Sequence, residues 1–147
     1  MKIGRMLGIL GLCAAATLAA CDPGGGGGDD DPSGLPPGDV ARGMSLVEAG
    51  QCKTCHAPDL AGSPEVIPGT MVYSSNITPD DATGIGLWTD KEIDQLMRLG
   101  KSRSSGEAVC EPMPVYDNLS DQDSADIIAY LRSVPPVSRE VLDSVCH

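Results

Sequence analysis

Apolar residues recur at helical spacing in three separate stretches of this 147-residue chain. The first stretch follows Asp39, a residue suited to capping a helix N-terminus, and runs to Gly50, where we expect the helix to end. Its predicted inward face consists of Val40, Gly43, Met44 and Val47. A glycine inside a helix costs about 1 kcal/mol relative to alanine, so Gly43 indicates that a partner packs very closely there.

The other two stretches begin with capping boxes, in which a Ser or Thr is followed three residues later by an acidic residue. The second stretch starts with the box over residues 89–92, and Gly100 is predicted to end it. The third starts with the box over residues 120–123 and is terminated by the prolines at 135–136. The predicted inward faces are Ile93, Leu96 and Met97 in the second stretch, and Ser124, Ile127, Ile128 and Leu131 in the third.

The hydrophobic pattern is lost between these stretches. Residues 57–87 and 101–118 carry repeated prolines and glycines and give no convincing strand. An unpatterned connection as long as 57–87, in a domain this small, usually wraps a ligand or is disordered. The predicted fold class is therefore all-α, with about three main helices and long loops.

The pentapeptide Cys52-Lys53-Thr54-Cys55-His56 directly follows the first predicted helix. Two cysteines separated by two residues and followed by histidine are the attachment signature of a c-type haem. The cysteines add as thioethers to the two vinyl groups of the porphyrin, and the imidazole can bind its iron. We therefore expect one covalent haem c, held by Cys52, Cys55 and His56 and wrapped by the long loops.

Other uses of this motif fit the sequence less well. A thioredoxin-like redox pair would need a neighbouring βαβ pattern, and the hydrophobic periodicity gives none. A structural zinc site would need two further ligands, for which Cys146 and His147 are the remaining candidates. A disulfide between Cys52 and Cys55 would give His56 no role.

The N-terminus has the features of an export signal. Lys2 and Arg5 precede an apolar run over residues 7–18, which is too short to span a bilayer. The run ends in Leu18-Ala19-Ala20-Cys21, which resembles the lipobox of bacterial lipoproteins. We expect residues 1–20 to be removed and Cys21 to anchor the protein by lipid on the periplasmic side of a membrane. The alternative is an ordinary cleaved signal with a chance cysteine.

Residues 21–38 are rich in Gly, Asp and Pro and predict a flexible tether, which leaves 39–147 as the folded domain. The whole chain has a formal charge of −11. Loss of Lys2 and Arg5 with the signal leaves eight basic against 21 acidic residues, or −13. Such a surface disfavours nucleic acid and favours a protein partner with a basic docking patch.

A single histidine leaves the second axial position of the iron to another side chain. The methionines downstream of the signal are Met44, Met71, Met97 and Met113. The first and third fall on predicted helix faces, where packing is expected, and the second lies in an unpatterned loop. Met113 stands between Pro112 and Pro114, which restrict the backbone. We predict Met113 as the sixth ligand, with Met71 as the alternative.

Two cysteines are left after the haem, the lipid and Cys13 of the signal are assigned. These are Cys110 and Cys146, and an oxidising compartment would allow them to pair. We predict a disulfide between them, formed as the tail folds back towards the Met113 side. The predicted apolar contacts of the tail are Val137, Val141, Leu142 and Val145. The alternatives are two free buried thiols, or Cys110 as an occasional haem ligand.

Short segments spread over residues 39–137 form a specific set. They are Asn76-Ile77-Thr78-Pro79-Asp80, Thr83-Gly84-Ile85-Gly86, Trp88-Thr89-Asp90, Pro112-Met113-Pro114-Val115-Tyr116, Leu119-Ser120-Asp121 and Ala129-Tyr130-Leu131-Arg132-Ser133-Val134-Pro135-Pro136. With the haem motif, this set resembles c-type cytochromes of bacterial electron-transfer chains. The likeness is greatest to the cytochrome subunits of membrane alcohol and sugar-acid dehydrogenases.

The resemblance implies the small all-α cytochrome c fold, with His56 and Met113 as axial ligands. It implies a close crossing of the first and last helices, which would place Gly43 against Tyr130. It also implies that Trp88 packs on the haem edge or meets a propionate, with plain core packing as the alternative. The chain departs from the family in having one haem motif where such subunits often have three, and in having a cysteine at 110.

These observations together predict an electron carrier that is not an enzyme, because ligation by both His56 and Met113 leaves no iron position for a substrate. The expected partners are redox proteins. One alternative is an electron-transfer subunit of a dehydrogenase or oxidase complex. Another is a haem-based redox or gas sensor, which would need a displaceable sixth ligand. The acidic pair at 80–81 is expected to be a solvated loop, with a calcium site as the alternative.

Overall fold

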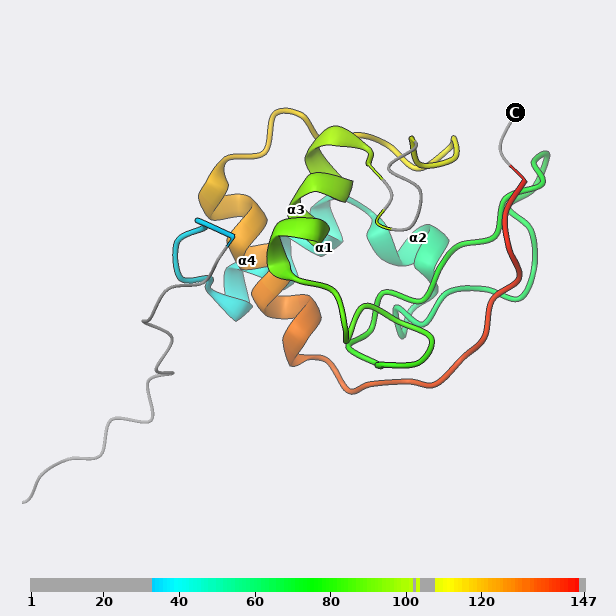
Figure 1. The fold of residues 1–147 in the computed structure, drawn as a ribbon, viewed down its shortest axis with the longest axis horizontal. Coiled ribbons are helices and arrows are strands. Elements are labelled where there is room, and N and C mark those ends of the chain that lie inside the picture. The colour runs from blue at the N-terminus through cyan, green and yellow to red at the C-terminus, as the bar shows by residue number, and fades with distance from the viewer. Residues whose placement is uncertain (1–32, 102, 104–107, 146–147) are drawn as a thin grey trace, which may run out of the picture.

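The computed structural model of the protein describes residues 33–101, 103 and 108–145. These residues form α1 (Val40–Ala49), α2 (Cys52–His56), α3 (Asp90–Leu99) and α4 (Asp121–Ser133), joined by long loops (Figure 1). The predicted all-α fold class and its three main helices are confirmed, and the short α2 is the haem motif itself. Within the described ranges, extended backbone pairs only in two isolated bridges, Val66 with Tyr73 and Lys101 with Ala108.

The three main helices begin and end where their capping residues predict. The Asp39 side chain accepts a hydrogen bond from the backbone of the first turn of α1. Both capping boxes, over residues 89–92 and 120–123, are fully formed at the starts of α3 and α4. Gly100 ends α3 in the left-handed conformation, with φ of 63°, which glycine adopts without steric strain. Local sequence alone thus determines these helix boundaries.

The helices α1, α3 and α4 pack around one apolar core. Its buried members are Val47, Leu60, Ile85, Ile93, Met97, Ile127, Ile128 and Leu131. The inward face predicted for α4 is confirmed, and so are Ile93 and Met97 of α3, whereas Leu96 is only half-buried. The face predicted for α1 is partly wrong. Val40 and Met44 are 46% and 43% exposed, whereas Gly43 and Val47 are buried. The close approach of α4 at Gly43 turns that side of α1 inward and leaves positions 40 and 44 towards solvent.

The crossing of α1 and α4 is as close as the glycine in α1 indicates. A Cβ atom on Gly43 would lie 1.8 Å from the carbonyl oxygen of Asp126 and 2.9 Å from Cβ of Tyr130. The predicted contact between Gly43 and Tyr130 is therefore confirmed. No side chain larger than hydrogen fits at position 43 unless the two helices move apart.

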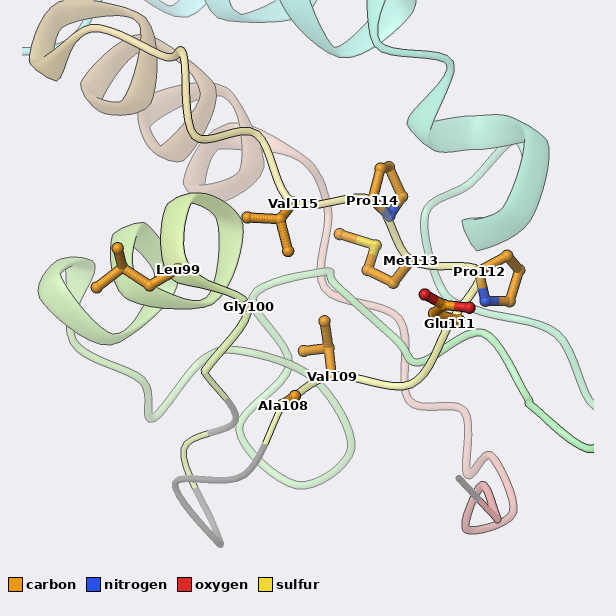
Figure 2. A pocket seen from close by; sticks show the side chains of 9 residues that line it. All are labelled: Leu99, Gly100, Ala108, Val109, Glu111, Pro112, Met113, Pro114 and Val115. Atoms are coloured by element: carbon orange, nitrogen blue, oxygen red, sulfur yellow. The ribbon is translucent and has the colours of Figure 1, made fainter. Parts of the chain in front are cut away.

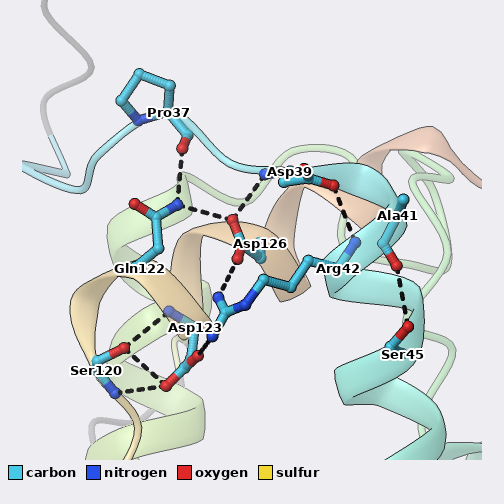
Figure 3. A network of polar contacts seen from close by, with 9 residues as sticks. All are labelled: Pro37, Asp39, Ala41, Arg42, Ser45, Ser120, Gln122, Asp123 and Asp126. Carbon is cyan, nitrogen blue, oxygen red and sulfur yellow. Dashed lines mark hydrogen bonds and ion pairs between the residues drawn. The ribbon is translucent and has the colours of Figure 1, made fainter.

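A buried carboxylate on α4 fixes the start of α1 (Figure 3). Asp126 is fully buried and accepts hydrogen bonds from the backbone N–H of Asp39 at 2.7 Å and from Gln122 at 2.8 Å. The guanidinium of Arg42 bridges Asp126 and Asp123. Burial raises the pKa of Asp126, but these hydrogen bonds and the Arg42 charge outweigh it and hold the pKa below its usual value. The carboxylate is therefore ionised at neutral pH and ties both helices together.

The residues just before α1 also contact α4. Leu35 packs against the core, and the Pro37 carbonyl accepts a hydrogen bond from Gln122 at 2.9 Å. A Cβ atom on Gly38 would lie 2.3 Å from the Ala125 carbonyl oxygen. Residues 35–38, assigned to the tether from their composition, thus lie against the helices. The predicted signal, the lipid site Cys21 and most of the tether lie outside the described residues.

Long loops and the C-terminal tail form the other half of the molecule (Figure 1). The loop after α2 carries no helix up to α3, as its sequence predicts, and the tail after α4 runs alongside it. The predicted apolar contacts of the tail are partly wrong, because Leu142 is 66% exposed and Val145 is 52% exposed. Polar bonds attach the tail instead. No helix in the described part of the chain is long and apolar enough to cross a bilayer.

Candidate haem-binding site

The helix α2 presents the three chemically distinctive side chains of the motif together. Cys52 and Cys55 are three residues apart in one helical turn, and His56 is four residues from Cys52. Residues at these spacings lie on the same face of a helix. Both cysteines are free thiols, Cys52 half-buried and Cys55 exposed. The alternative disulfide between them is therefore not formed, and both sulfurs are available for attachment.

The imidazole of His56 is oriented by a backbone carbonyl from the following loop. Its Nδ1 lies 2.7 Å from the carbonyl oxygen of Ser75. Because a carbonyl can only accept, Nδ1 carries the proton and Nε2 keeps its lone pair for a metal. Burial lowers the pKa of His56, and the hydrogen bond to Ser75 offsets this only in part. The ring is therefore neutral at pH 7, which is the state that ligates iron.

Backbone strain flanks the motif on both sides. Gln51, Ala57 and Leu60 have φ of 54°, 64° and 61°, in the left-handed region that non-glycine residues rarely adopt. Such residues cost on the order of 1–3 kcal/mol each and persist only where the surrounding structure enforces them. The turn that presents His56 is thus held in place by the rest of the fold.

The loop between α3 and α4 carries the predicted sixth ligand. Met113 is half-buried and forms part of the wall of a cavity of about 430 Å³. The cavity is lined by Leu99, Gly100, Ala108, Val109, Glu111, Pro112, Met113, Pro114 and Val115 (Figure 2). The side chains of Val109, Met113 and Val115 converge on it in Figure 2. A thioether beside apolar side chains is a suitable donor for haem iron.

Tyr116 links this methionine loop to the haem motif. Its backbone N–H donates to the Met97 carbonyl at 2.8 Å, and its hydroxyl donates to the Gly50 carbonyl at 3.3 Å. The phenol also lies beside Cys52, and burial is the main cause that raises the pKa of each of these two side chains. The methionine loop is therefore attached to the haem motif at Tyr116, three residues after Met113. The sequence placed Tyr116 in a family segment but gave it no role.

The other methionines have different surroundings. Met97 is buried in the core, as expected for packing, whereas Met44 is 43% exposed. Met71, the alternative ligand, is 49% exposed, and its carbonyl accepts a hydrogen bond from Val145 of the tail at 3.2 Å. Met71 is not among the residues that line the cavity. These surroundings favour Met113 over Met71 as the ligand.

Trp88 lies two residues before α3 and packs against the core. Its carbonyl accepts a hydrogen bond from Arg132 of α4, and the guanidinium of Arg103 lies 5.8 Å from the centre of its ring. The structure therefore shows the core-packing role for Trp88. A contact of Trp88 with a haem edge or propionate stays a prediction.

The acidic pair at 80–81 shows no sign of cation binding. The Asp80 carboxylate accepts hydrogen bonds from the backbone and hydroxyl of Thr83, at 2.7 and 2.8 Å, and so closes a turn. Over the described residues, no group of three or more His, Cys, Asp or Glu side chains is placed to hold a metal ion. These bonds agree with the solvated loop expected at 80–81 and give no support to the calcium alternative.

The donor set fits a covalently attached haem. Two free thiols share a helix face with a neutral imidazole whose Nε2 is available, and a thioether lines a cavity in the linked loop. A small helical fold with this motif directly after its first helix defines the class of c-type cytochrome domains. The cytochrome c family model matches residues 40–135, and the chain belongs to the cytochrome c family.

Three relatives show where such domains occur. The chain is 35% identical over 112 residues to a gluconate 2-dehydrogenase cytochrome c subunit of Pantoea cypripedii, covering 71% of this chain and 25% of that protein. It is 34% identical to a diheme cytochrome c-type protein of Cereibacter sphaeroides (69% and 38% covered). It is 32% identical to an alcohol dehydrogenase (quinone) cytochrome c subunit of Gluconacetobacter polyoxogenes (68% and 23% covered). The chain thus spans less than two fifths of the length of each.

Proposed function

We propose that the chain carries a single haem c and transfers electrons between redox proteins. The observation that carries this proposal is the hydrogen bond from Nδ1 of His56 to Ser75, beside two free thiols in one helical turn. When bound, a c-type haem supplies a reversible one-electron couple at its iron. One CxxCH motif in the sequence supports one haem, in contrast to the relative named as diheme.

Each residue of the proposed site has a physical role. Cys52 and Cys55 attach the cofactor, and Nε2 of His56 supplies one axial lone pair. The Met113 sulfur supplies the other, and neighbours such as Val109 and Val115 line the cavity beside it. With both axial positions filled by protein, no position is left for a substrate. The chain is therefore proposed as a carrier and not as a catalytic subunit.

Covalent attachment is the experiment that tests this function. In protein expressed with a haem-maturation system, acid–organic extraction should leave the colour on the wild-type polypeptide. The double variant Cys52→Ser/Cys55→Ser should lose all covalent haem, because no sulfur is left to add to the vinyl groups. Thr54→Ala, which changes an exposed residue between the two cysteines, is the matched control and should retain the haem. Free extraction of haem from the wild type would contradict the proposal.

A second candidate is an electron-transfer subunit of a dehydrogenase complex. It is favoured by similarity to relatives that are named as cytochrome c subunits of gluconate 2-dehydrogenase and of quinone-dependent alcohol dehydrogenase. Co-purification of the untagged chain with a dehydrogenase would support this role. In either case the net charge of −11 over the whole sequence favours a partner that docks through a basic patch.

We further propose that Cys21 is lipidated after removal of residues 1–20, on the periplasmic side of a membrane, and that Cys110 pairs with Cys146. The support is the Leu-Ala-Ala-Cys end of the apolar segment and the oxidising compartment that export implies. Cys21 and Cys146 lie outside the described residues, so both proposals rest on the sequence.

Intact-mass analysis of the mature protein tests both modifications. We expect a mass that includes one haem and the acyl groups on Cys21. The Cys21→Ser variant should lack the acyl groups but keep the haem. Denaturing reduction should add two hydrogens, because one disulfide opens. An unmodified N-terminus would exclude the lipid. Alkylation of Cys110 and Cys146 in unreduced, denatured protein would exclude the bridge.

A further inference from the structure

The C-terminal segment 137–145 follows the region matched by the cytochrome c family model, which ends at residue 135. It has no helix or strand, and none of its four large apolar residues is buried, since two are half-buried and two are exposed. Even so, backbone and side-chain hydrogen bonds hold it at both ends and in the middle. We define residues 137–145 as the tail strap.

The strap is bound by the loop that follows the haem motif. Near its start, the Val137 carbonyl accepts from the Asn76 side chain at 2.7 Å, and the Val137 N–H donates to the Thr78 hydroxyl at 3.1 Å. Near its end, the Ser144 hydroxyl accepts from the Tyr73 N–H at 2.9 Å and donates to the Tyr73 carbonyl at 3.2 Å. Their partners in this loop are two residues before Ser75, and one and three residues after it. The strap therefore holds the short segment that contains this residue from both sides.

Arg139 binds the other segment that contacts His56. Its guanidinium pairs with Asp59 at 2.7 Å and donates to the Gly62 carbonyl at 3.0 Å. The N–H of Gly62 in turn donates to the His56 carbonyl at 3.0 Å. A Cβ atom on Gly62 would lie 2.7 Å from the carbonyl carbon of Ser75, so Gly62 packs directly on that peptide. Arg139 thus holds the turn after α2 in contact with the Ser75 peptide, whose carbonyl accepts the imidazole hydrogen bond.

The direction of the Ser75 carbonyl is fixed through its neighbour Asn76. The carbonyl of Ser75 and the N–H of Asn76 belong to one planar peptide group, so immobilising Asn76 immobilises the acceptor. Asn76 is buried, and its amide also donates to the Thr83 hydroxyl at 2.9 Å and accepts from the Thr78 N–H at 2.9 Å. The bond to Val137 completes this set.

We propose that the tail strap is a positioning element for the haem ligand, in which Arg139, Ser144 and the Val137 backbone hold the Ser75 carbonyl on Nδ1 of His56. A carbonyl held there fixes the orientation of the ring and raises the donor strength of Nε2. Stronger donation favours the oxidised iron, so the strap lowers the reduction potential. This inference rests on the proposed function, since it needs a haem bound by His56.

The test uses full-length, haem-loaded protein and two pairs of matched variants. Arg139→Gln removes the guanidinium bonds to Asp59 and Gly62, and Arg103→Gln makes the same charge change away from the strap. Ser144→Ala removes the hydroxyl that bonds to Tyr73 without changing the charge. Ser45→Ala likewise removes a hydroxyl, on the exposed side of α1. The measurements are the midpoint potential and the hydrogen exchange of the His56 ring N–H by proton NMR.

We expect Arg139→Gln to raise the potential beyond the shift of Arg103→Gln, by about tenfold in the reduction equilibrium, or about 59 mV for one electron. The His56 N–H should exchange faster in Arg139→Gln and Ser144→Ala than in either control. Arg139→Lys, which retains the charge and one donor, should recover part of both changes. If Arg139→Gln does not mature, Ser144→Ala alone decides through its exchange rate and potential.

Two outcomes overturn the inference. Equal potentials and equal exchange in the strap variants and their controls, even with lower thermal stability, would show that the tail only stabilises the fold. A wild-type protein without covalent haem would overturn the proposed function and the strap inference together. The two failures are distinguishable because the first is seen in protein that carries its haem.

Discussion

Met113→Ala is expected to lower the midpoint potential of the haem-loaded protein by on the order of 0.1–0.3 V, within the ~0.8 V range over which axial ligands set haem potentials. Methionine favours the reduced iron more than stronger donors do, so its loss moves the equilibrium towards the oxidised form. The weak absorption band near the red edge of the visible, typical of methionine ligation, should disappear. Carbon monoxide, which the wild type should exclude, should bind the reduced variant.

Met71→Ala is the control for this prediction, because Met71 is a loop methionine outside the cavity. Its potential and spectrum should match those of the wild type. If Met71→Ala loses the band and Met113→Ala keeps it, the ligand assignment is wrong. Wild-type protein that binds carbon monoxide readily would instead favour the sensor function, which needs a displaceable ligand.

Features that depend on neighbouring residues could be predicted from the sequence. The capping boxes over 89–92 and 120–123 and the glycine at 100 set the helix ends correctly, because a cap is satisfied within one turn. The haem motif could be predicted for the same reason, since its three chemical groups lie within five residues. Gly43 signalled a distant contact because its cost in a helix needs compensation.

Features that depend on contacts between distant segments could not be predicted. The acceptor for His56 is the backbone carbonyl of Ser75, nineteen residues away, and every residue has such a carbonyl. The exposure of Met44 follows from how closely α4 approaches α1, which apolar periodicity does not determine. The tail was expected to attach through apolar residues, but Arg139 and Ser144 attach it through specific polar partners.

The proximal and distal sides of the proposed haem site are supported by different parts of the chain. On the His56 side, the acceptor carbonyl belongs to a loop without helices that depends on the tail strap. On the Met113 side, Tyr116 joins the methionine loop to α3 and to the end of α1 through backbone groups. Both supports in turn depend on a stable packing of α1 against α4, because α1 leads directly into α2.

Gly43→Ala is expected to lower the free energy of unfolding by roughly 3 kcal/mol, at the upper end of the range for overpacked sites. Two effects oppose each other at this position. Alanine improves helix propensity by about 1 kcal/mol, but its Cβ would lie 1.8 Å from the Asp126 carbonyl oxygen. The clash is with backbone and not with a flexible side chain, so α4 must shift, and the steric cost prevails.

The displacement of α4 would also weaken contacts away from Gly43. Moving α4 away from α1 also strains the bonds of Asp126 to Asp39 and Arg42. Thermal unfolding of haem-loaded Gly43→Ala should show a Tm lower by about 12–24 °C, from the usual 4–8 °C per kcal/mol for a domain of this size. Ser45→Ala, two residues along the same helix and exposed, should unfold within 0.5 kcal/mol or so of the wild type. A Gly43→Ala protein as stable as Ser45→Ala would mean that the helices do not cross this closely in solution.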